Sequence, residues 1–339
     1  MKKRRICIIY TGGTIGMIPS ERGYIPSSGA FRRLLRAIPD LYWDAMPEWD
    51  VVEFDPLLDS SDVAVREWNQ MGRAIAERYD DYDGFVILHG TDTMAYSASA
   101  LAFMLENLAK PVIFTGAQIP LGQIRTDGRD NIINSMLIAA SGRVHEVCIY
   151  FNSRLLRGNR SVKVNATGFD AFGSPNYPPL ATAGISIKYN SSYIHYPQNG
   201  HKSFAIHTSL DTRVSILKIH PGITEQAVRD ILLGSGTRAV ILETYGAGNA
   251  ISKDWFLRIV READRMGKVL LNVTQCLSGD VDMDIYATGR NLKDAGVISG
   301  HDTTTESALG KLFYLMGNYD DNAKVKALLE KNLKGEISK

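Results

Sequence analysis

Short apolar runs alternate with segments of helical spacing along most of the chain. Residues 85–88 form a continuous apolar run, short enough for a strand that is buried on both faces of a parallel sheet. Small polar side chains follow at residues 89–93, and alanine- and leucine-rich helical spacing then runs through residues 96–107. A buried strand that leads into a polar turn and a helix is typical of the ligand crevice of α/β proteins. Thr91 or Asp92 could cap the helix, but capping needs only one polar residue. This turn offers three, Thr91, Asp92 and Thr93, so the sequence favours a functional role for it.

The same alternation extends through the first half of the chain. It predicts strands at residues 6–10, 51–54, 85–88, 111–114 and 146–151, with helices at 63–79, 96–107 and from about 125 to 140. Ser61 or Asp62 is expected to cap the helix at 63–79, with Glu67 in its first turn. Strands alternating with helices predict right-handed βαβ units and a large, mainly parallel, doubly wound sheet. On this topology four strand ends converge on one edge of the sheet, and they carry Thr14, Ser60 and Ser61, Thr91 and Asp92, and Ala117.

A second, smaller α/β unit is predicted after residue 213. Strands are expected at residues 214–220, 239–243 and 269–274, and helices at 224–233, 252–265 and 303–316. Residues 191–213 are polar and lack a clear period, so they are interpreted as a linker between domains at 1–190 and 214–339. His195, His201 and His207 are irregularly spaced there, which argues against a metal site.

Two segments carry polar or aromatic residues without a strong period. Residues 17–28 contain Pro19, Gly23 and Pro26, which predicts a long mobile loop carrying Tyr24. Residues 154–163 are strongly basic, with Arg157, Arg160 and Lys163 among them. Without further information this stretch is interpreted as a solvated basic hairpin.

Composition excludes several classes of function. The formal net charge is +1, which gives no electrostatic case for binding nucleic acid or an anionic membrane. The three cysteines lie far apart, which favours buried reduced thiols over disulfides or zinc ligands. The apolar stretch behind the basic start is too short for a signal peptide, and no run reaches transmembrane length. The sequence therefore predicts a cytoplasmic protein.

The glycine-rich turn after the first strand has the spacing of neither common nucleotide-binding motif. Gly12, Gly13 and Gly16 give G-G-x-x-G, which differs from both the dinucleotide fingerprint and the phosphate loop. Two adjacent glycines before Thr14 would hold a hydroxyl on a flexible backbone with free amide groups nearby. That arrangement suits a nucleophile as well as it suits a phosphate.

TGGTIG at residues 11–16 and HGTDTM at residues 89–94 together resemble the bacterial-type L-asparaginases, in their cytoplasmic type I branch. The order and spacing of DSSD, TGAQ, RGNRSVK and YGAGN along the chain fit the same family. The resemblance implies hydrolysis of the side-chain amide of L-asparagine, with no metal or organic cofactor. It also implies a homodimer or homotetramer.

The resemblance also implies roles for individual residues. The implied catalytic residues are Thr14, Tyr24, Thr91, Asp92 and Lys163. The implied substrate-binding residues are Asp59, Ser60, Ser61, Gly90, Ala117 and Asn249, with Asn249 reaching the active site of a neighbouring subunit.

The residue types fit this chemistry. Amide hydrolysis needs an activated hydroxyl, an oxyanion site and an acid for the departing ammonia. A lysine can serve as the base only when its ammonium form is destabilised. The expected route forms a β-aspartyl ester on Thr14 and then deacylates it with water, although the sequence leaves open whether Thr14 or the Thr91–Lys163 pair attacks first.

Two other functions stay open. One is the amidase subunit that releases ammonia from glutamine for transfer-RNA amidation, which is disfavoured because such subunits carry an additional N-terminal domain. The other is a non-catalytic α/β protein that binds a small ligand or nucleotide, which would need no paired threonines and lysine.

The chain departs from the family pattern in one respect. Allosteric members resemble this chain at its Thr274-Gln275-Cys276 turn, but they carry an arginine where this chain has Glu243 and a hydroxyl where it has Val162. A carboxylate repels the α-carboxylate of a free amino acid. We therefore expect the effector site to be absent or altered, unless Arg213 or Arg238 supplies the missing cation.

Overall fold

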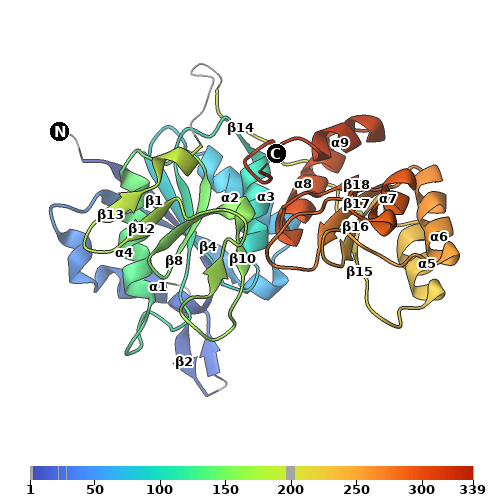
Figure 1. The fold of residues 1–339 in the computed structure, drawn as a ribbon. Coiled ribbons are helices and arrows are strands. Elements are labelled where there is room, and N and C mark those ends of the chain that lie inside the picture. Colours follow the sequence, from blue (N-terminus) through green and yellow to red (C-terminus); the bar gives the residue numbers. More distant parts are fainter. Residues whose placement is uncertain (1–2, 22, 28, 196–202, 339) are drawn as a thin grey trace. The chain divides into compact units, whose positions relative to one another are not determined.

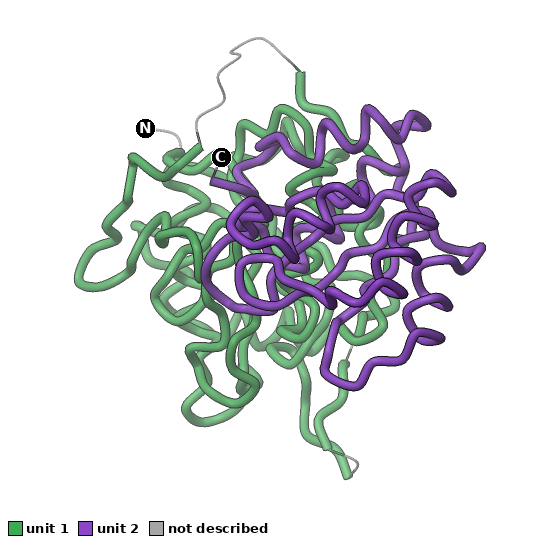
Figure 2. The backbone as a smooth tube through the Cα atoms, turned by 45° about the vertical axis from the view of Figure 1, so that its right-hand side comes forward, with its two compact units in different colours: residues 1–208 green, residues 209–339 purple. Residues whose placement is uncertain are grey.

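The computed structural model describes residues 3–21, 23–27, 29–195 and 203–338. The chain divides into two compact units, residues 1–208 (unit 1) and residues 209–339 (unit 2), coloured separately in Figure 2. The expected linker at 191–213 is shared between them. Its described residues 191–195 and 203–208 belong to unit 1, residues 209–213 belong to unit 2, and residues 196–202 lie outside the described residues.

Unit 1 is built on an eight-stranded sheet in the order β13–β12–β9–β8–β7–β5–β1–β4 (Figure 1). Five strands run parallel to one another: β1 (Arg5–Gly12), β4 (Glu48–Leu58), β5 (Gly84–Leu88), β7 (Val112–Thr115) and β8 (Val147–Phe151). Three continue the sheet in antiparallel pairing: β9 (Arg154–Arg157), β12 (Ala181–Ala183) and β13 (Ile187–Tyr189). The mainly parallel sheet is confirmed, with an antiparallel end that the apolar pattern did not predict.

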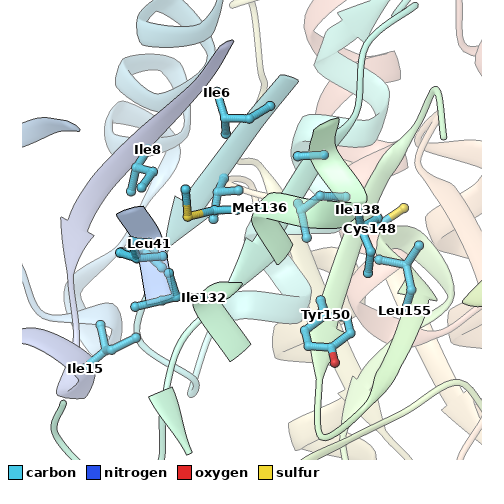
Figure 3. Packing of buried hydrophobic residues seen from close by; sticks show 14 of the residues in the cluster. Ile6, Ile8, Ile15, Leu41, Ile132, Met136, Ile138, Cys148, Tyr150 and Leu155 are labelled. Atoms are coloured by element: carbon cyan, nitrogen blue, oxygen red, sulfur yellow. The ribbon is translucent and has the colours of Figure 1, made fainter. Parts of the chain in front are cut away.

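Helices cover both faces of this sheet, because successive side chains of each strand point to opposite faces. Among the described residues of unit 1, the α-helices are α1 (Ala30–Arg36), α2 (Val65–Ala76), α3 (Met94–Met104) and α4 (Gly128–Ala140). Ile6 and Ile8 of β1 share a buried cluster with Ile132 and Met136 of α4 (Figure 3). Phe85 points to the other face, where its ring lies 6.2 Å from that of Tyr79, which follows α2. The sheet is therefore doubly wound, as expected.

The helix after β5 is almost completely buried, since only Tyr96 of α3 is not. It ends at Met104, earlier than the expected residue 107, because the chain then forms β6 (Leu105–Glu106), which pairs with β14 (Ala205–Ile206). A helix buried on all sides shows no amphipathic stripe, so periodicity could not place its end.

The loop expected at residues 17–28 is in fact a short hairpin in its described residues. β2 (Ile18–Ser20) pairs with β3 (Gly23–Ile25), which places Tyr24 opposite Pro19. The hairpin projects from the rest of unit 1 (Figure 1). Strands of three residues are too short to give a recognisable alternation, which is why the sequence pattern missed them.

The expectation that residues 154–163 form a solvated basic hairpin is wrong, because two of its arginines are buried. Arg157 is 5% exposed and Arg160 is 1% exposed. The Arg157 guanidinium donates to the buried Glu146 carboxylate, with 2.5 Å between Nε and Oε2. Its counter-charge is Glu146, which directly precedes β8, so the stretch taken alone gives no sign of a compensating carboxylate. The chain here passes through the short helix η4 (Gly158–Arg160) to β10 (Val162–Lys163), which pairs with β11 (Phe172–Gly173).

Unit 2 is a four-stranded, all-parallel sheet with a buried core on each face. Its strands are β15 (Val214–Lys218), β16 (Ala239–Thr244), β17 (Val269–Thr274) and β18 (Ile298–Ser299). Its helices are α5 (Glu225–Leu233), α6 (Asp254–Arg265), α7 (Ala287–Asp294), α8 (Thr305–Asn318) and α9 (Asn322–Leu329). The smaller α/β unit is confirmed, while β18, α7 and α9 were not predicted.

Two properties of the described residues bear on the expectations from composition. Cys7 and Cys148 are buried free thiols, but Cys276 is exposed, so the expectation of buried thiols holds for two of the three. In the described part of the chain, no helix combines the length and the apolar character that crossing a membrane requires.

Candidate functional site

The carboxyl ends of β1, β4 and β5 meet at one edge of the unit 1 sheet. β1 lies between β4 and β5 in the sheet, and all three strands are parallel. The hydroxyl of Thr93, after β5, donates to the carbonyl of Ser60, after β4, over 2.7 Å. The predicted convergence of the Thr14, Ser60 and Thr91 segments is therefore present.

Glycines allow these three segments to approach closely. A Cβ atom added to Gly90 would lie 2.3 Å from Ser60 Oγ, and one added to Gly13 would lie 2.5 Å from the Gly90 nitrogen. Gly13 also has a φ of +85°, which side-chain-bearing residues rarely adopt. We call this contact of Gly13, Ser60 and Gly90 the glycine junction. Any larger residue at Gly13 or Gly90 would push the segments apart.

Thr14 lies just beyond the glycine junction, at the start of the short helix η1 (Thr14–Gly16). The next residue, Ile15, is fully buried and packs near Ile132 of α4 (Figure 3). The carbonyl of Ile15 also accepts a hydrogen bond from the Leu121 backbone over 2.9 Å. Thr14 is thus anchored by its neighbour, while no described residue forms a hydrogen bond with its hydroxyl.

Thr91, Asp92 and Lys163 form a contiguous polar group. Lys163 Nζ lies 2.9 Å from Thr91 Oγ1 and 2.6 Å from Asp92 Oδ1. The lysine side chain is 18% exposed, whereas that of Asp92 is 68% exposed. Lys163 therefore belongs to this strand edge and not to a solvated basic surface, because β10 carries it across to the turn after β5.

Gln118 is a further member of this group that the sequence analysis did not single out. Its Oε1 lies 3.3 Å from Thr91 Oγ1, while its Nε2 donates to the Gly168 carbonyl over 3.0 Å. The Asp127 carboxylate accepts from the Gln118 backbone N–H. Gln118 belongs to the same TGAQ strand end as Ala117, so the position of that tetrapeptide was the available signal. Ala117 itself is buried, with 1% exposure.

Asp59 and Ser61 are exposed, and Ser60 is buried. One Asp59 carboxylate oxygen accepts from both the backbone N–H and the hydroxyl of Ser61, at 3.0 and 2.9 Å. The expectation that Ser61 or Asp62 caps the following helix is wrong. Ala64 is the N-cap of α2, and Glu67 accepts its N–H, so the polar residues before it are left for other contacts.

Two further predicted site residues lie on the β2–β3 hairpin and in unit 2. Tyr24 is 49% exposed and pairs with Pro19 in the β2–β3 hairpin, and within the described residues it forms no hydrogen bond with Thr14. Asn249 belongs to unit 2, where the Thr288 hydroxyl donates to its Oδ1 over 2.6 Å. Within the described residues, no group of three or more His, Cys, Asp or Glu side chains is arranged to hold a metal ion.

The unit 1 edge offers two hydroxyl groups for chemistry. That of Thr14 has no hydrogen-bond partner among the described residues, and that of Thr91 accepts a hydrogen bond from the Lys163 amine. An amine in its neutral form accepts a proton from a hydroxyl, and the Asp92 carboxylate holds the Lys163 amine beside the Thr91 hydroxyl. The edge therefore has the parts for acyl transfer through a hydroxyl nucleophile.

Comparison with known proteins gives consistent matches over almost the whole chain. Two family models match, "Asparaginase, N-terminal" over residues 5–195 and "Glutaminase/Asparaginase C-terminal domain" over residues 213–329. "L-asparaginase 1" from Escherichia coli (strain K12) is 47% identical over 340 residues, covering 100% of this chain and 99% of that protein. "60 kDa lysophospholipase" from Mus musculus is 40% identical, covering 99% of this chain but 63% of that protein. The crystal structure of L-asparaginase I from Vibrio cholerae has a TM-score of 0.92 and 43% identity, covering 99% of each chain.

Proposed function

The chain belongs to the asparaginase family, and we propose that it is an amidohydrolase that converts L-asparagine to L-aspartate and ammonia. The observation that carries the proposal is the Thr91–Asp92–Lys163 contact beside the Thr14 turn. A ligand-binding protein would have no need for a lysine amine held 2.9 Å from a threonine hydroxyl.

In the first step, the Thr14 hydroxyl attacks the side-chain amide carbon of asparagine. The Thr14 hydroxyl proton passes to the amide nitrogen, the C–N bond breaks, ammonia leaves, and a β-aspartyl ester forms on Thr14. Tyr24 assists from the β2–β3 hairpin. Backbone N–H groups at the glycine junction stabilise the negative charge that develops on the substrate oxygen.

In the second step, water hydrolyses the ester. As water attacks the ester carbon, Lys163, held by Asp92, takes a proton from the water through the Thr91 hydroxyl. The ester C–O bond then breaks, the proton returns to the departing Thr14 oxygen, and the Thr14 hydroxyl and aspartate are released. The α-amino and α-carboxylate groups of the substrate are held by Asp59, Ser60 and Ser61, with Gly90 and Ala117 lining the site. No metal or organic cofactor is needed for either step.

Ammonia release tests this proposal directly. The purified protein, incubated with asparagine or with glutamine in parallel, is expected to release ammonia faster from asparagine. The pocket distinguishes the two by one methylene, worth about 1–3 kcal/mol. Faster release from glutamine would favour the glutamine-hydrolysing amidase. No release from either would favour a ligand-binding protein.

We further propose a cytoplasmic homodimer or homotetramer in which Asn249 completes the site of a neighbouring subunit. Asn249 lies in a glycine-containing turn, where Gly248 has a φ of +105°, and this geometry suits close approach to another surface. Sedimentation equilibrium combined with activity assays on dilution tests the assembly. A monomer that keeps full specific activity would contradict it.

A further inference from the structure

A buried histidine lies directly below the glycine junction and has no role in the proposed reaction. His89 is 1% exposed and joins β5 to Gly90. Its Nδ1 lies 2.7 Å from the Gly90 carbonyl oxygen, and its Nε2 lies 3.0 Å from Ser97 Oγ of α3. Ser97 Oγ in turn lies 2.9 Å from Nε1 of Trp68 in α2. These contacts link two helices to the backbone of the crevice.

The direction of each hydrogen bond follows from what each group can do. The indole N–H of Trp68 can only donate, so Ser97 Oγ accepts it, and the Gly90 carbonyl can only accept, so His89 Nδ1 carries a proton. Burial lowers the pKa of His89 to about 4, so the ring is neutral near pH 7 and its Nε2 has no proton. Ser97 therefore donates to Nε2. The chain runs in one direction, from Trp68 through Ser97 and His89 to Gly90.

The Gly90 carbonyl matters because its peptide group continues into Thr91. The peptide is planar, so fixing the carbonyl also fixes the Thr91 N–H, which points the opposite way, away from His89. No described residue accepts a hydrogen bond from this N–H. The same Gly90 backbone touches Gly13 and Ser60 in the glycine junction. A tilt of this one peptide would therefore move the three segments that carry Thr14, Ser60 and Thr91.

We propose that His89 is a positioning residue for amide hydrolysis, and that it acts by holding the Gly90–Thr91 peptide through a one-directional hydrogen-bond chain from Trp68 and Ser97. This inference rests on the proposed function. It goes beyond that function by assigning work to residues that do not touch substrate.

Two replacements of His89 separate positioning from simple packing. In His89→Asn, the amide nitrogen takes the place of Nδ1 and keeps the bond to Gly90. In His89→Gln, the amide reaches the place of Nε2 and loses that bond. Both variants remove the ring, so their melting temperatures are expected to fall alike. The Gln variant is expected to lose about 10- to 100-fold in kcat with little change in KM, since small misplacements of reacting groups have effects of this size. The Asn variant is expected to keep most of the wild-type kcat. Equal kcat values in the two variants would overturn the proposal.

Position 97 provides a second test with a matched control. Ser97→Ala removes the donor to Nε2 and is expected to lower kcat by a smaller factor, with no further loss when it is combined with His89→Gln. Ser99 lies on the same helix, is fully buried, and its hydroxyl has no hydrogen-bond partner among the described residues. Ser99→Ala is therefore expected to leave kcat unchanged. An additive loss in the double variant would contradict a single chain.

Nitrogen NMR of the wild-type protein labelled at histidine decides the hydrogen-bond direction without reference to activity. We expect His89, assigned by the loss of its signal in His89→Asn, to keep its proton on Nδ1 from pH 5 to pH 8. A proton on Nε2, or titration within that range, would overturn the proposal even if asparagine is hydrolysed. If the wild type releases no ammonia but the Nδ1 proton is present, the proposed function fails while the hydrogen-bond chain stands.

Discussion

The two units each present the carboxyl edge of a parallel sheet, but the polar groups at the two edges are used differently. In unit 2, the Thr244 hydroxyl donates to Asn272 Oδ1 over 2.6 Å, and Asn272 Nδ2 donates to the Gly248 carbonyl over 3.1 Å. Gln275 Nε2 donates to two strand-end carbonyls, those of Ile219 and Glu243. In unit 1, the Thr14 hydroxyl has no described partner, and Lys163 is delivered from outside the parallel strands.

This difference indicates that the polar residues of the unit 2 edge stabilise the fold, whereas those of the unit 1 edge are available for catalysis. Buried polar groups generally form hydrogen bonds, and Thr244, Asn272 and Gln275 of the unit 2 edge bond to one another or to nearby backbone carbonyls. The unit 1 edge instead keeps unused hydrogen-bonding capacity and brings its segments together through glycines. Polar residues at strand ends therefore indicate a crevice, whereas their partners indicate whether it can do chemistry.

The largest effect on activity is expected from removing the Thr14 hydroxyl of the unit 1 edge, and removal of the Thr244 hydroxyl of the unit 2 edge is its control. Thr14→Ala should abolish ammonia release, by about 10³-fold or more, because no other group carries the acyl intermediate. Fold and aspartate binding should persist, as measured by circular dichroism and calorimetry. Thr244→Ala removes a buried donor in unit 2, so it should cost about 1–3 kcal/mol of unfolding free energy without lowering kcat. Substantial turnover by a folded Thr14→Ala enzyme would remove Thr14 from the mechanism.

The Thr91–Lys163 contact is expected to behave as one functional group. Thr91→Val and Lys163→Met should each lower kcat about as much as the pair of changes made together, because residues that act as a unit do not contribute additively. Steady-state assays of the two single variants and the double variant measure this. Strictly multiplicative losses would mean that the two side chains act independently.

The glycine junction can be tested by adding a single methyl group. In Gly90→Ala, the new Cβ would lie 2.3 Å from Ser60 Oγ, so the segments must separate. A displacement of about 1 Å is expected to lower kcat/KM by about 10²-fold. Gly236 of unit 2 has nothing within 4 Å of its Cβ position and no positive φ. Gly236→Ala is the control, with stability expected to change by less than about 0.5 kcal/mol. Normal activity in Gly90→Ala would show that the close approach is not needed.

Much of the unit 1 fold was predictable because its central strands are fully buried apolar runs between helices. The sequence also indicated the converging strand ends, since parallel topology alone places Thr14, Ser60 and Thr91 at one edge. The hairpin at residues 18–25 and the long strand β4 were not predictable in full, because short or partly polar strands give weak alternation.

The parts of the site that sequence pattern could not supply depend on contacts between distant residues. Lys163 reaches Thr91 across 72 positions of the chain, and Glu146, just before β8, neutralises Arg157. The family resemblance implied a catalytic role for Lys163, whereas the basic residues around it predicted a solvated surface. Gln118 and His89 belong to the TGAQ and HGTDTM motifs, but no role was predicted for either, because the hydrogen bonds through which they act exist only in the folded chain.

A buried carboxylate in unit 2 is expected to make stability depend on pH. Burial, with the neighbouring Glu243 carboxylate, raises the pKa of Glu306 to about 6 from its ordinary value of 4.5. The folded state therefore binds this proton more tightly than the unfolded state, so the stabilisation is full below pH 4.5 and is lost as pH rises through 6. Glu306→Gln should raise the unfolding free energy by up to about 2 kcal/mol at pH 7.5 and leave it unchanged near pH 4. Urea unfolding at both pH values tests this, and an equal effect at both would exclude the titration.

The last prediction concerns the unit 2 edge. We expect no cooperativity in the dependence of rate on asparagine concentration. The resemblance to allosteric asparaginases implies an arginine at the position where this chain has Glu243. Glu243 Oε1 accepts from the Thr305 hydroxyl over 2.7 Å, and Oε2 lies 3.7 Å from Lys218 Nζ. A second carboxylate brought to this place would be repelled by one already held there.

The two arginines that could have replaced the missing cation are already paired elsewhere. Arg213 and Arg238 both bind Asp211, at 2.7 and 2.9 Å, and they directly precede β15 and β16, at the opposite end of the strands from Glu243. Neither can therefore bind an effector carboxylate at the Glu243 end. Val162 also lacks a hydroxyl. We expect a hyperbolic dependence of rate on asparagine, with a Hill coefficient of about 1 from far below to far above KM. Glu243→Gln keeps an acceptor for Thr305 and should leave the curve hyperbolic. A sigmoidal curve for the wild type would mean that an effector site exists despite Glu243.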